Sequence, residues 1–589
     1  MKFKNIFFIF LFLATLFING FFKTYRLTQL PPALFSDEVD AGYQAFVFNN
    51  CFSDYFGNKF PTHFHSFSDW RTSLYIYSTS LVQKFTGANE LSVRLPSVIF
   101  GFISPLVFYF IIKKLLNNKW WALLSIFFFS ISPWIVHYSR TGFEVSGMIL
   151  VLLLGILYWL KYLDSKKNLH LILSALFFIS SIYFYSTAKL FLVFVALSMI
   201  LVWSKEIFSI KNKTKIFLLI IIFILPFIVD SLRGRAGFRF SYINIFGNPV
   251  IPTTNSYLRY EDAILNHYGE IGLQTSLLSK ISHNYLTEVS SKFITNYFSS
   301  FSTDFLFLKG DSNLRQGFGQ RGYLLYPDLI FVLIGITSSF QFLLKPKSKR
   351  TLLIKFSEFM ILWLFFAPIP FALTRDSNSA HGTRLIIMSI PLLFFSFSGI
   401  YYIFEHFNKI KPLLSKIFLT LTLGLYLFCF FDFYHFYTYH YPQNSARDWH
   451  TGMKETIIFS ESLPPSTKIY FSNEHESFIP FFLFYKKYLP THNTCSPAKN
   501  LIWDNNDFFT GMQTEQKYYF GHLEWNKLAR DRNNITGSIF VIPKDEKERM
   551  ENGIRDYNQS NGKDIKITLI NKTSTKYLNQ EEFYFVSLN

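Results

Sequence analysis

The apolar run IFFIFLFLATLFINGFF at residues 6–22 decides the fold class of this chain. The run carries no charge and follows Lys2 and Lys4, which is typical of a membrane-spanning helix whose N-terminus stays in the cytoplasm. A secretory signal peptide would be followed by a small-x-small cleavage site, and none follows here. We therefore expect this run to remain in the protein as a first transmembrane helix.

Similar apolar runs recur along most of the chain. Half of all residues are hydrophobic and only 16% are charged, a composition typical of a polytopic membrane protein. The window pattern predicts about eleven transmembrane helices. After the first, at 5–22, they are expected at 95–112, 120–137, 145–162, 169–186, 188–203, 215–231, 323–343, 355–373, 384–404 and 414–431.

The net charge of +18 is compatible with nucleic-acid binding, but the distribution of charge argues against it. Lys and Arg cluster in short loops between alternate apolar runs, for example at Lys113, Lys114 and Lys119, as the positive-inside rule predicts. That side is therefore cytoplasmic. We expect a multi-pass protein of the plasma (inner) membrane, with a cytoplasmic N-terminus, an extracytoplasmic C-terminal domain, the lipid bilayer as partner and no nucleic acid.

The segments expected on the outer side are the longer ones. The membrane domain spans residues 1–431, with a first external loop at 23–94 and a second at 233–322. The tail, 432–589, regains acidic residues and contains short β-like runs, so we expect a soluble extracytoplasmic α/β domain. These runs lie at Lys468–Phe471, Lys517–Phe520, Gly537–Ile542, Ile565–Ile570 and Glu582–Val586.

The chain has three cysteines, Cys51, Cys429 and Cys495, and they form no CxxC pattern. A zinc site or a disulfide framework is therefore not expected. Cys51 and Cys495 both fall on the predicted outer side, which leaves a bridge between them open.

The first external loop contains the acid pair Asp37-Glu38 within FSDEVDAGY at 35–43. Neighbouring acids repel each other and lose solvation near lipid, so a pair kept there is a candidate general base with a helper. The alternative is that Ser36 or Asp37 caps a short helix that starts at Glu38. Both interpretations can hold at once.

Other polar clusters also fall on the predicted outer side. If they converge on one face, they place several cations around a few acids, which suits a phosphate at the membrane surface with a carboxylate nearby. Simpler roles stay open: a helical ion pair for Arg140 and Glu144, a turn for Asp311, and lipid-headgroup contact for the arginines. The residues concerned are Arg94, Arg140, Glu144, Asp311, Asn313, His381 and Arg384.

Several of these stretches resemble bacterial members of glycosyltransferase family 39, which belong to the GT-C class of integral membrane glycosyltransferases. The resemblance covers roughly residues 1–410. It rests on Asp37-Glu38, Gly42-Tyr43, Asp54–Asn58, Ser66–Asp69, Leu74–Tyr77 and Val93–Pro96, and on the weaker matches Ser132–Trp134, Ser139-Arg140, Phe305–Asn313 and His381–Arg384.

The resemblance implies a GT-C fold and a hexosyl- or pentosyltransferase. The donor would be a polyprenyl-phosphate-linked sugar, and the acceptor a hydroxyl of a lipid, glycan or protein outside the membrane, with inversion at the anomeric carbon. Asp37 takes the place of the catalytic base, with Glu38 beside it and Glu144 as a second acid.

Arg71 matches a basic residue that contacts the donor phosphate, and Arg94, Arg140, His381 and Arg384 are further candidates. Asp69, Asp311 and Asn313 lie in the matching stretches as other candidate site residues. Relatives often carry Arg-His after Gly-Asp-x-Asn, whereas this chain has Arg315-Gln316, which weakens any role for a histidine there.

No cofactor is expected, although adjacent acids can hold a divalent cation. A transporter or flippase of lipid-linked glycans is one alternative function, but it would carry polar residues deep within its helices, whereas here they lie near the helix ends. An oligosaccharide ligase shares the donor and topology and stays open. A non-catalytic scaffold is a further alternative.

Overall fold

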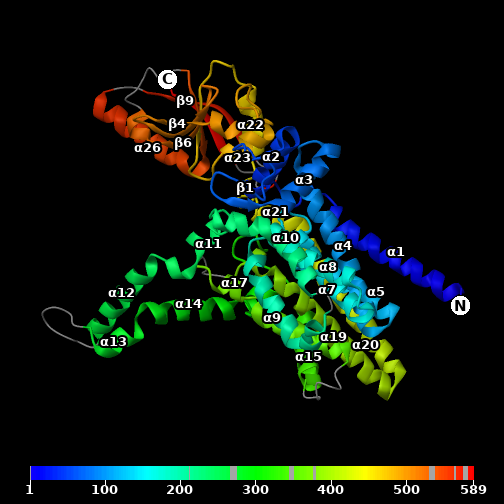
Figure 1. The fold of residues 1–589 in the computed structure, drawn as a ribbon. Coiled ribbons are helices and arrows are strands. Elements are labelled where there is room, and N and C mark those ends of the chain that lie inside the picture. Colours follow the sequence, from blue (N-terminus) through cyan, green and yellow to red (C-terminus); the bar gives the residue numbers. More distant parts are fainter. Residues whose placement is uncertain are drawn as a thin grey trace. The chain divides into compact units, whose positions relative to one another are not determined.

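The computed structural model describes residues 2–210, 213–265, 275–343, 351–375, 380–528, 537–562, 565–574, 577 and 581–588 (Figure 1). The chain folds as two compact units. We call them the helical unit (Met1–Phe22, Phe100–Tyr138 and Glu144–Tyr434) and the mixed unit (Lys23–Ile99, Ser139–Phe143 and His435–Asn589).

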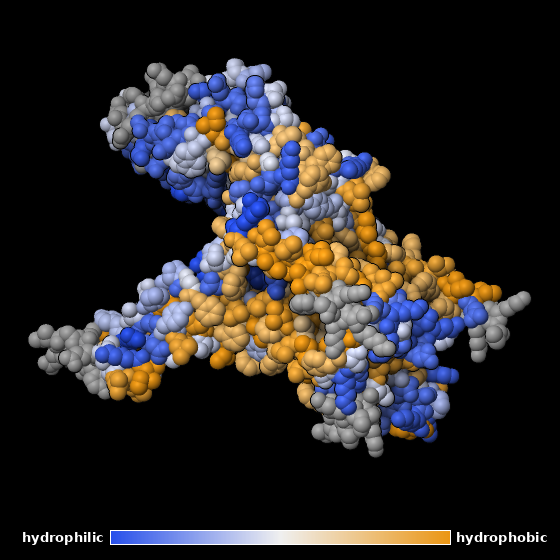
Figure 2. All heavy atoms as spheres, viewed as in Figure 1, coloured by the Kyte–Doolittle hydropathy of each residue, from blue (hydrophilic) through white to orange (hydrophobic). Residues whose placement is uncertain are grey.

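Long apolar helices dominate the helical unit, and its surface is largely hydrophobic (Figure 2). Among the described residues, seven helices are long and apolar enough to cross a membrane. They span Asn5–Thr24, Glu90–Leu116, Val145–Ser165, Thr187–Phe208, Leu352–Ala372, Gly382–Ile410 and Pro412–Asn444. Shorter apolar helices span Lys119–Ser130, Asn168–Phe184 and Leu218–Leu232. The polytopic membrane class is confirmed, and the number eleven stays a prediction.

The labelled helices that lie wholly or mostly in this unit follow these segments closely. They are α1 (Lys2–Thr24), α4 (Glu90–Leu116), α5 (Lys119–Ser130), α6 (Pro133–Tyr138), α7 (Val145–Ser165), α8 (Asn168–Phe184), α9 (Thr187–Phe208), α10 (Lys213–Leu232), α15 (Tyr326–Leu343), α16 (Leu352–Phe366), α17 (Ile369–Ala372), α18 (Gly382–Leu385), α19 (Ser389–Ile410) and α20 (Pro412–His435). The run expected at 120–137 is divided between α5 and α6, because Pro133 lacks the N–H that a continuous helix needs.

Small residues allow α15 and α19 to pack closely. A Cβ added at Gly335 would lie 2.0 Å from the carbonyl oxygen of Phe395, and one added at Gly399 would lie 2.1 Å from that of Phe331. The two backbones are therefore in direct contact, as is common between membrane helices that meet at glycine. Larger side chains at either position would force the helices apart.

The described part of the second predicted external loop is largely helical. It contains α11 (Phe238–Ile243), α12 (Val250–Leu265), α13 (Leu277–Ser282) and α14 (Tyr285–Ser299), followed by a π-turn at Asp304–Leu308. The buried amide of Asn296 donates to the carbonyls of Ala372 (3.3 Å) and Thr374 (2.9 Å). This contact fixes the end of α14 against the segment after α17.

The tail forms a seven-stranded sheet, which confirms the predicted α/β region (Figure 1). The strand order is β4-β5-β6-β3-β7-β9-β8, with β3 parallel to β6 and β7 and the other pairs antiparallel. The bounds are β3 (Ile469–Ser472), β4 (Ile502–Asn505), β5 (Phe509–Thr514), β6 (Tyr518–Leu523), β7 (Ile539–Pro543), β8 (Ile567–Ser574) and β9 (Glu581–Leu588). All five predicted runs are strands, and β4 and β5 are additional.

Helices cover both faces of the sheet. The apolar side chains of α26 (Lys544–Asn561), among them Met550 and Ile554, pack with Tyr470 and Phe540. The second core contains α22 (Met453–Glu461) and α23 (Ile479–Tyr485).

The first external loop folds together with this tail. It forms α2 (Ser36–Cys51), the hairpin β1 (His63–His65) and β2 (Trp70–Thr72), and α3 (Ser73–Thr86). Gly42 of α2 lies so close to α23 that an added Cβ would be 2.6 Å from the Phe484 ring. Tyr43 donates to the carbonyl of Tyr488 (2.7 Å), and a disulfide joins Cys51 to Cys495. The bridge that the sequence left open is therefore formed.

Candidate functional site

Two acids of α2 share one arginine. Nη2 of Arg71 lies 2.6 Å from Oδ1 of Asp37, and its Nε contacts Oδ2 of Asp40. Arg71 stands on β2, where it pairs with Phe64 of β1. Asp37 and Asp40 are three residues apart, so the helix places them on the same face. That spacing is the sequence signal that could have identified Asp40, which we did not predict.

The two acids differ in burial. The side chain of Asp37 is 45% exposed, whereas Asp40 is buried. Asp40 accepts hydrogen bonds from the hydroxyls of Tyr55 (2.8 Å) and Ser66 (3.0 Å) in addition to Arg71. Asp40 is therefore a fixed anchor for the guanidinium, and Asp37 is the acid that reaches solvent.

Glu38 is completely buried and belongs to a different cluster. Its Oε1 and Oε2 accept from Nε (3.0 Å) and Nη2 (3.1 Å) of Arg94, which is equally buried. Oε1 also accepts from the N–H of Gly142 (2.5 Å), and Oε2 from that of Phe35 (3.3 Å). Glu38 therefore caps the N-terminus of α2, the role expected for Ser36 or Asp37, and a structural role suits it better than a catalytic one.

The other N–H groups of Arg94 bind backbone carbonyls of residues 27–33, namely those of Leu27 (3.0 Å), Pro31 (2.9 Å) and Ala33. Because the N–H groups of this buried guanidinium already have acceptors, few are left to bind a phosphate. We therefore assign Arg94 to the folding of this segment. Arg140 is likewise buried and donates to the carbonyls of Tyr25 (2.6 Å) and Leu30 (3.1 Å).

Asp69 closes the turn between β1 and β2. Its carboxylate accepts from the N–H of Trp70 (2.7 Å), and its carbonyl accepts from the N–H of Ser66 (2.8 Å). The turn sets the position of Ser66, which in turn binds Asp40.

A cavity of about 550 Å³ opens at Asp37. Its first-loop wall contains Ser36, Asp37, Asp40, Ser66, Phe67, Ser68 and Arg71. The rest is contributed by the tail: Asn473, Glu476, Ser477, Ile479, Pro480, Trp503, Thr510, Gly511, Met512, Phe520, Gly521 and His522. Its volume is typical of a ligand pocket, for which about 300–1,000 Å³ is usual. Glu38 does not line it.

Asp311 organises a second group of predicted residues, in the helical unit. Its carboxylate accepts from the N–H groups of Asn313 (2.9 Å) and Gly382 (2.9 Å), and Nδ1 of His381 lies 3.8 Å away. Burial raises the pKa of Asp311 to about 6. Only glycine fits at position 382, because an added Cβ would lie 1.9 Å from the hydroxyl oxygen of Tyr323.

His381 is held near positive charge. Burial among its neighbours, followed by the charges of Arg384, Arg239 and Arg315, holds its pKa well below the usual value. A quarter of the side chain remains exposed. His381 is therefore neutral at physiological pH and would contact a phosphate as a neutral hydrogen-bonding group.

Arg384 lines a cavity of about 330 Å³ in the helical unit. Lys189 and Arg239 line it too, and neither was predicted. Nη1 of Arg384 donates to the hydroxyl of Thr374 (2.8 Å), and Nζ of Lys189 donates to the carbonyl of Ala236 (2.8 Å). Much of the remaining wall is apolar, including Leu190, Phe227, Phe240, Ile243 and Pro370. The sequence signal that could have identified Lys189 is its position. It lies at the predicted outer end of an apolar helix, where the positive-inside rule makes a lysine unusual.

Glu144 precedes α7, whose N-cap it occupies. Together with Arg239 and Arg384, it acts electrostatically on the buried Tyr185, which also lines the 330 Å³ cavity. Glu144 and Arg384 therefore act on the same buried tyrosine, and the role of Glu144 as a second acid stays a prediction.

The predicted residues are thus divided between the two units. Asp37, Glu38, Asp69, Arg71, Arg94 and Arg140 belong to the mixed unit, and Glu144, Asp311, Asn313, His381 and Arg384 to the helical unit. Their convergence on a single face stays a prediction. Within the described part of the chain, no group of three or more His, Cys, Asp or Glu side chains could hold a metal ion.

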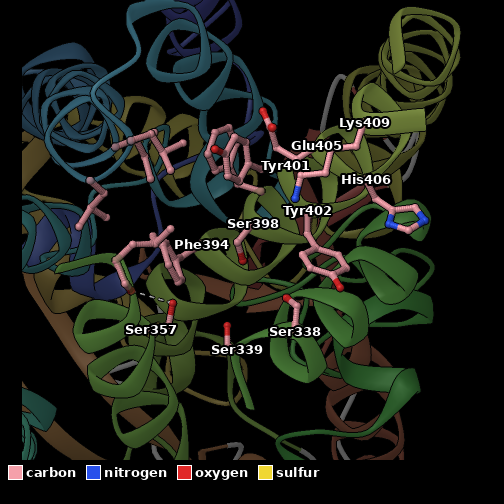
Figure 3. A pocket seen from close by; sticks show the side chains of 15 residues that line it. Ser338, Ser339, Ser357, Phe394, Ser398, Tyr401, Tyr402, Glu405, His406 and Lys409 are labelled. Carbon is pink, nitrogen blue, oxygen red and sulfur yellow. Dashed lines mark hydrogen bonds between the residues drawn. The ribbon is translucent and has the colours of Figure 1, made fainter. Parts of the chain in front are cut away.

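A further cavity of about 310 Å³ lies near the C-terminal ends of α4, α15 and α19 and the N-terminal end of α16 (Figure 3). The hydroxyls of Ser338, Ser357 and Ser398 line it and donate to carbonyls of their own helices. The cavity lies at the helix ends with Lys114 and Lys409, on the predicted cytoplasmic side. We therefore assign it no part in chemistry at Asp37.

Residues 71–230, somewhat over a quarter of the chain, match the family model described as dolichyl-phosphate-mannose-protein mannosyltransferase. Several solved structures share the fold, among them two with a lipid phosphate bound. One is the archaeal oligosaccharyltransferase AglB from Archaeoglobus fulgidus in complex with an inhibitory peptide and a dolichol-phosphate (TM-score 0.53, 11% identity, 95% of this chain and 72% of that chain). The other is ArnT from Cupriavidus metallidurans bound to undecaprenyl phosphate (TM-score 0.50, 9% identity, 98% of this chain and 97% of that chain). Among curated proteins, none matches this sequence.

The fold is that of the GT-C class of integral membrane glycosyltransferases. The chain is a multi-pass membrane protein with this fold, and residues 71–230 are similar to the mannosyltransferase family. At 9–11% identity, the structural similarity shows only that the fold is shared. The substrates must be argued from the residues of this chain.

Proposed function

We propose that this protein transfers a hexosyl or pentosyl group from a polyprenyl-phosphate donor to an acceptor hydroxyl outside the plasma membrane. The observation that carries the proposal is Asp37, a half-exposed carboxylate held by Arg71 at a 550 Å³ cavity within a GT-C fold. The N-terminus would be cytoplasmic and the C-terminal α/β region extracytoplasmic.

In the proposed reaction, Asp37 accepts the proton of the acceptor hydroxyl while the hydroxyl oxygen attacks the anomeric carbon. The bond from that carbon to the phosphate oxygen breaks on the opposite face, so the configuration inverts. The lipid phosphate leaves with its electron pair as an anion. A positioned base of this kind contributes about 10²–10⁴-fold to the rate. The reaction as written uses no metal or nucleotide.

For the donor phosphate we propose the 330 Å³ cavity of the helical unit. Arg384, Lys189 and Arg239 supply positive charge there, and the apolar walls suit an isoprenoid chain. The dolichol-phosphate of the AglB complex and the undecaprenyl phosphate of the ArnT complex support a ligand of this chemistry. The base and the donor site rest on separate observations and are tested separately.

The base is tested with Asp37→Asn in cells that otherwise lack the gene. We expect transfer, measured by mass spectrometry of the cell-envelope glycans, to fall by about 10²–10⁴-fold, while purified protein still binds undecaprenyl phosphate. Asp507→Asn, which changes an exposed acid of the same unit, is the matched control and should behave as wild type. Wild-type transfer by Asp37→Asn would contradict the assignment.

The donor site is tested by binding of undecaprenyl phosphate to the purified protein. Arg384→Gln and Lys189→Gln should each weaken binding by about tenfold, since each removes a cation from the cavity. Lys280→Gln, an exposed lysine of α13, is the control. Unchanged affinity in both cavity variants would show that the donor phosphate does not bind in this cavity.

A further inference from the structure

The tail contributes a wall to the cavity at Asp37, and this wall contains an exposed indole and an unsatisfied amide oxygen. We propose that Trp503 and Asn473 form a carbohydrate subsite, so that the acceptor hydroxyl is carried by a sugar ring. The inference rests on the proposed function and adds the chemical class of the acceptor.

Trp503 stands on β4, the edge strand of the sheet, and is 62% exposed. A tryptophan buries about 150–250 Å² when it is covered, so an exposed indole on a cavity wall retains a large unused apolar surface. The C–H groups on one face of a sugar ring form a matching apolar surface. Their slight positive polarisation suits the negative face of the indole, which makes stacking favourable.

Asn473 supplies the polar half of the subsite. It directly follows β3, and its backbone N–H donates to the carbonyl of Gly521 (2.9 Å), which fixes the residue at the cavity. Its Oδ1 is buried and finds no hydrogen-bond donor among the described residues. A buried acceptor left unpaired is unfavourable, and because Asn473 lines the cavity, a rotation of its side chain would bring Oδ1 to a sugar hydroxyl.

Other groups on the same wall can complete recognition of hydroxyls. Glu476, Ser477 and Thr510 line the cavity and carry acceptors or hydroxyls. A peptide acceptor would instead be expected to add a strand along the edge of β4, which is only four residues long, and would not need the indole. The combination of an aromatic face with polar groups around it favours the sugar.

The test uses the full chain in detergent on an array of immobilised oligosaccharides built from glucose, galactose, mannose and N-acetylglucosamine. Wild type should bind a subset of them. Trp503→Ala should lower binding by about tenfold, and Trp503→Phe should restore part of it. Asn473→Ala should lower binding by about fivefold. Ile502→Ala is the matched control, because Ile502 is similarly exposed on the same strand and does not line the cavity.

The outcomes separate this inference from the proposed function. Asp37→Asn should keep glycan binding while it loses transfer. If Asp37→Asn retains transfer but Trp503→Ala loses glycan binding, the proposed base fails and the subsite stands. Absence of glycan binding by wild type, or equal binding by wild type and Trp503→Ala, would overturn the subsite. If wild type binds an array of peptides but no sugars, the acceptor is a peptide and the proposed carbohydrate subsite is wrong.

Discussion

Nη2 of Arg71 lies 2.6 Å from Oδ1 of Asp37, while Nε of the same guanidinium contacts the buried Asp40 one helical turn along α2. Asp40 is fixed by Tyr55 and Ser66, so the position of Arg71 is determined from the buried side. Arg71 then holds Asp37 at the cavity. Asp40 is therefore a positioning residue that acts on the base through Arg71.

This arrangement predicts that Arg71→Lys is not a conservative change. A lysine has one compact ammonium group and cannot reproduce the planar fork that joins both acids. We expect kcat for sugar transfer to fall by about tenfold or more, with a smaller change in KM for the donor. Full kcat in Arg71→Lys would show that the charge alone is required. Thermal unfolding of the same sample distinguishes lost positioning from lost folding.

The buried Glu38–Arg94 pair predicts a large effect on stability. Removal of one partner leaves an uncompensated charge, so Glu38→Ala or Arg94→Met should each cost about 3–5 kcal/mol. The double variant should lose less than the sum of the two, because no unpaired charge remains. Denaturant unfolding of the purified protein measures both. If Arg94→Met instead weakened undecaprenyl phosphate binding at unchanged stability, Arg94 would be a donor ligand after all.

The Cys51–Cys495 disulfide ties α2 to the tail and should stabilise the mixed unit. We expect the double variant Cys51→Ser/Cys495→Ser to lose about 2–5 kcal/mol. Reductant should destabilise wild type to the same degree and leave the double variant unchanged. Cys429→Ser, which changes the cysteine outside the bridge, serves as control. Equal stability of oxidised and reduced wild type would contradict the prediction.

The raised pKa of Asp311 predicts a pH dependence of stability. Between the ordinary value of 3.8 and about 6, the folded state binds a proton that the unfolded state has released. The stabilising contribution is therefore complete below about pH 4 and is lost as the pH rises through 6, a change of about 1–3 kcal/mol. Asp311→Asn cannot titrate, so the thermal midpoint of wild type relative to this variant should fall over that range. A difference in thermal midpoint between wild type and Asp311→Asn that stays constant from pH 4 to 7 would contradict the prediction.

Much of the fold was predictable because its signals are local. The apolar runs anticipated the long helices, and the five β-like runs of the tail are all strands. β4 and β5 were missed, since IWDN and FTGMQT show little apolar alternation. They become strands because β6 offers an edge for pairing, and pairing depends on residues that are distant in sequence.

The sequence by itself determined the membrane class and the importance of the acids after the first helix, because hydrophobic length and charge bias are properties of short segments. Only the tertiary structure decided which acids work together. Successive residues of a helix point about 100° apart, so Asp37 turns to the cavity with Asp40 while its neighbour Glu38 turns inward to Arg94. The tail, joined to α2 by a disulfide across 444 residues, brings Trp503 to that same cavity.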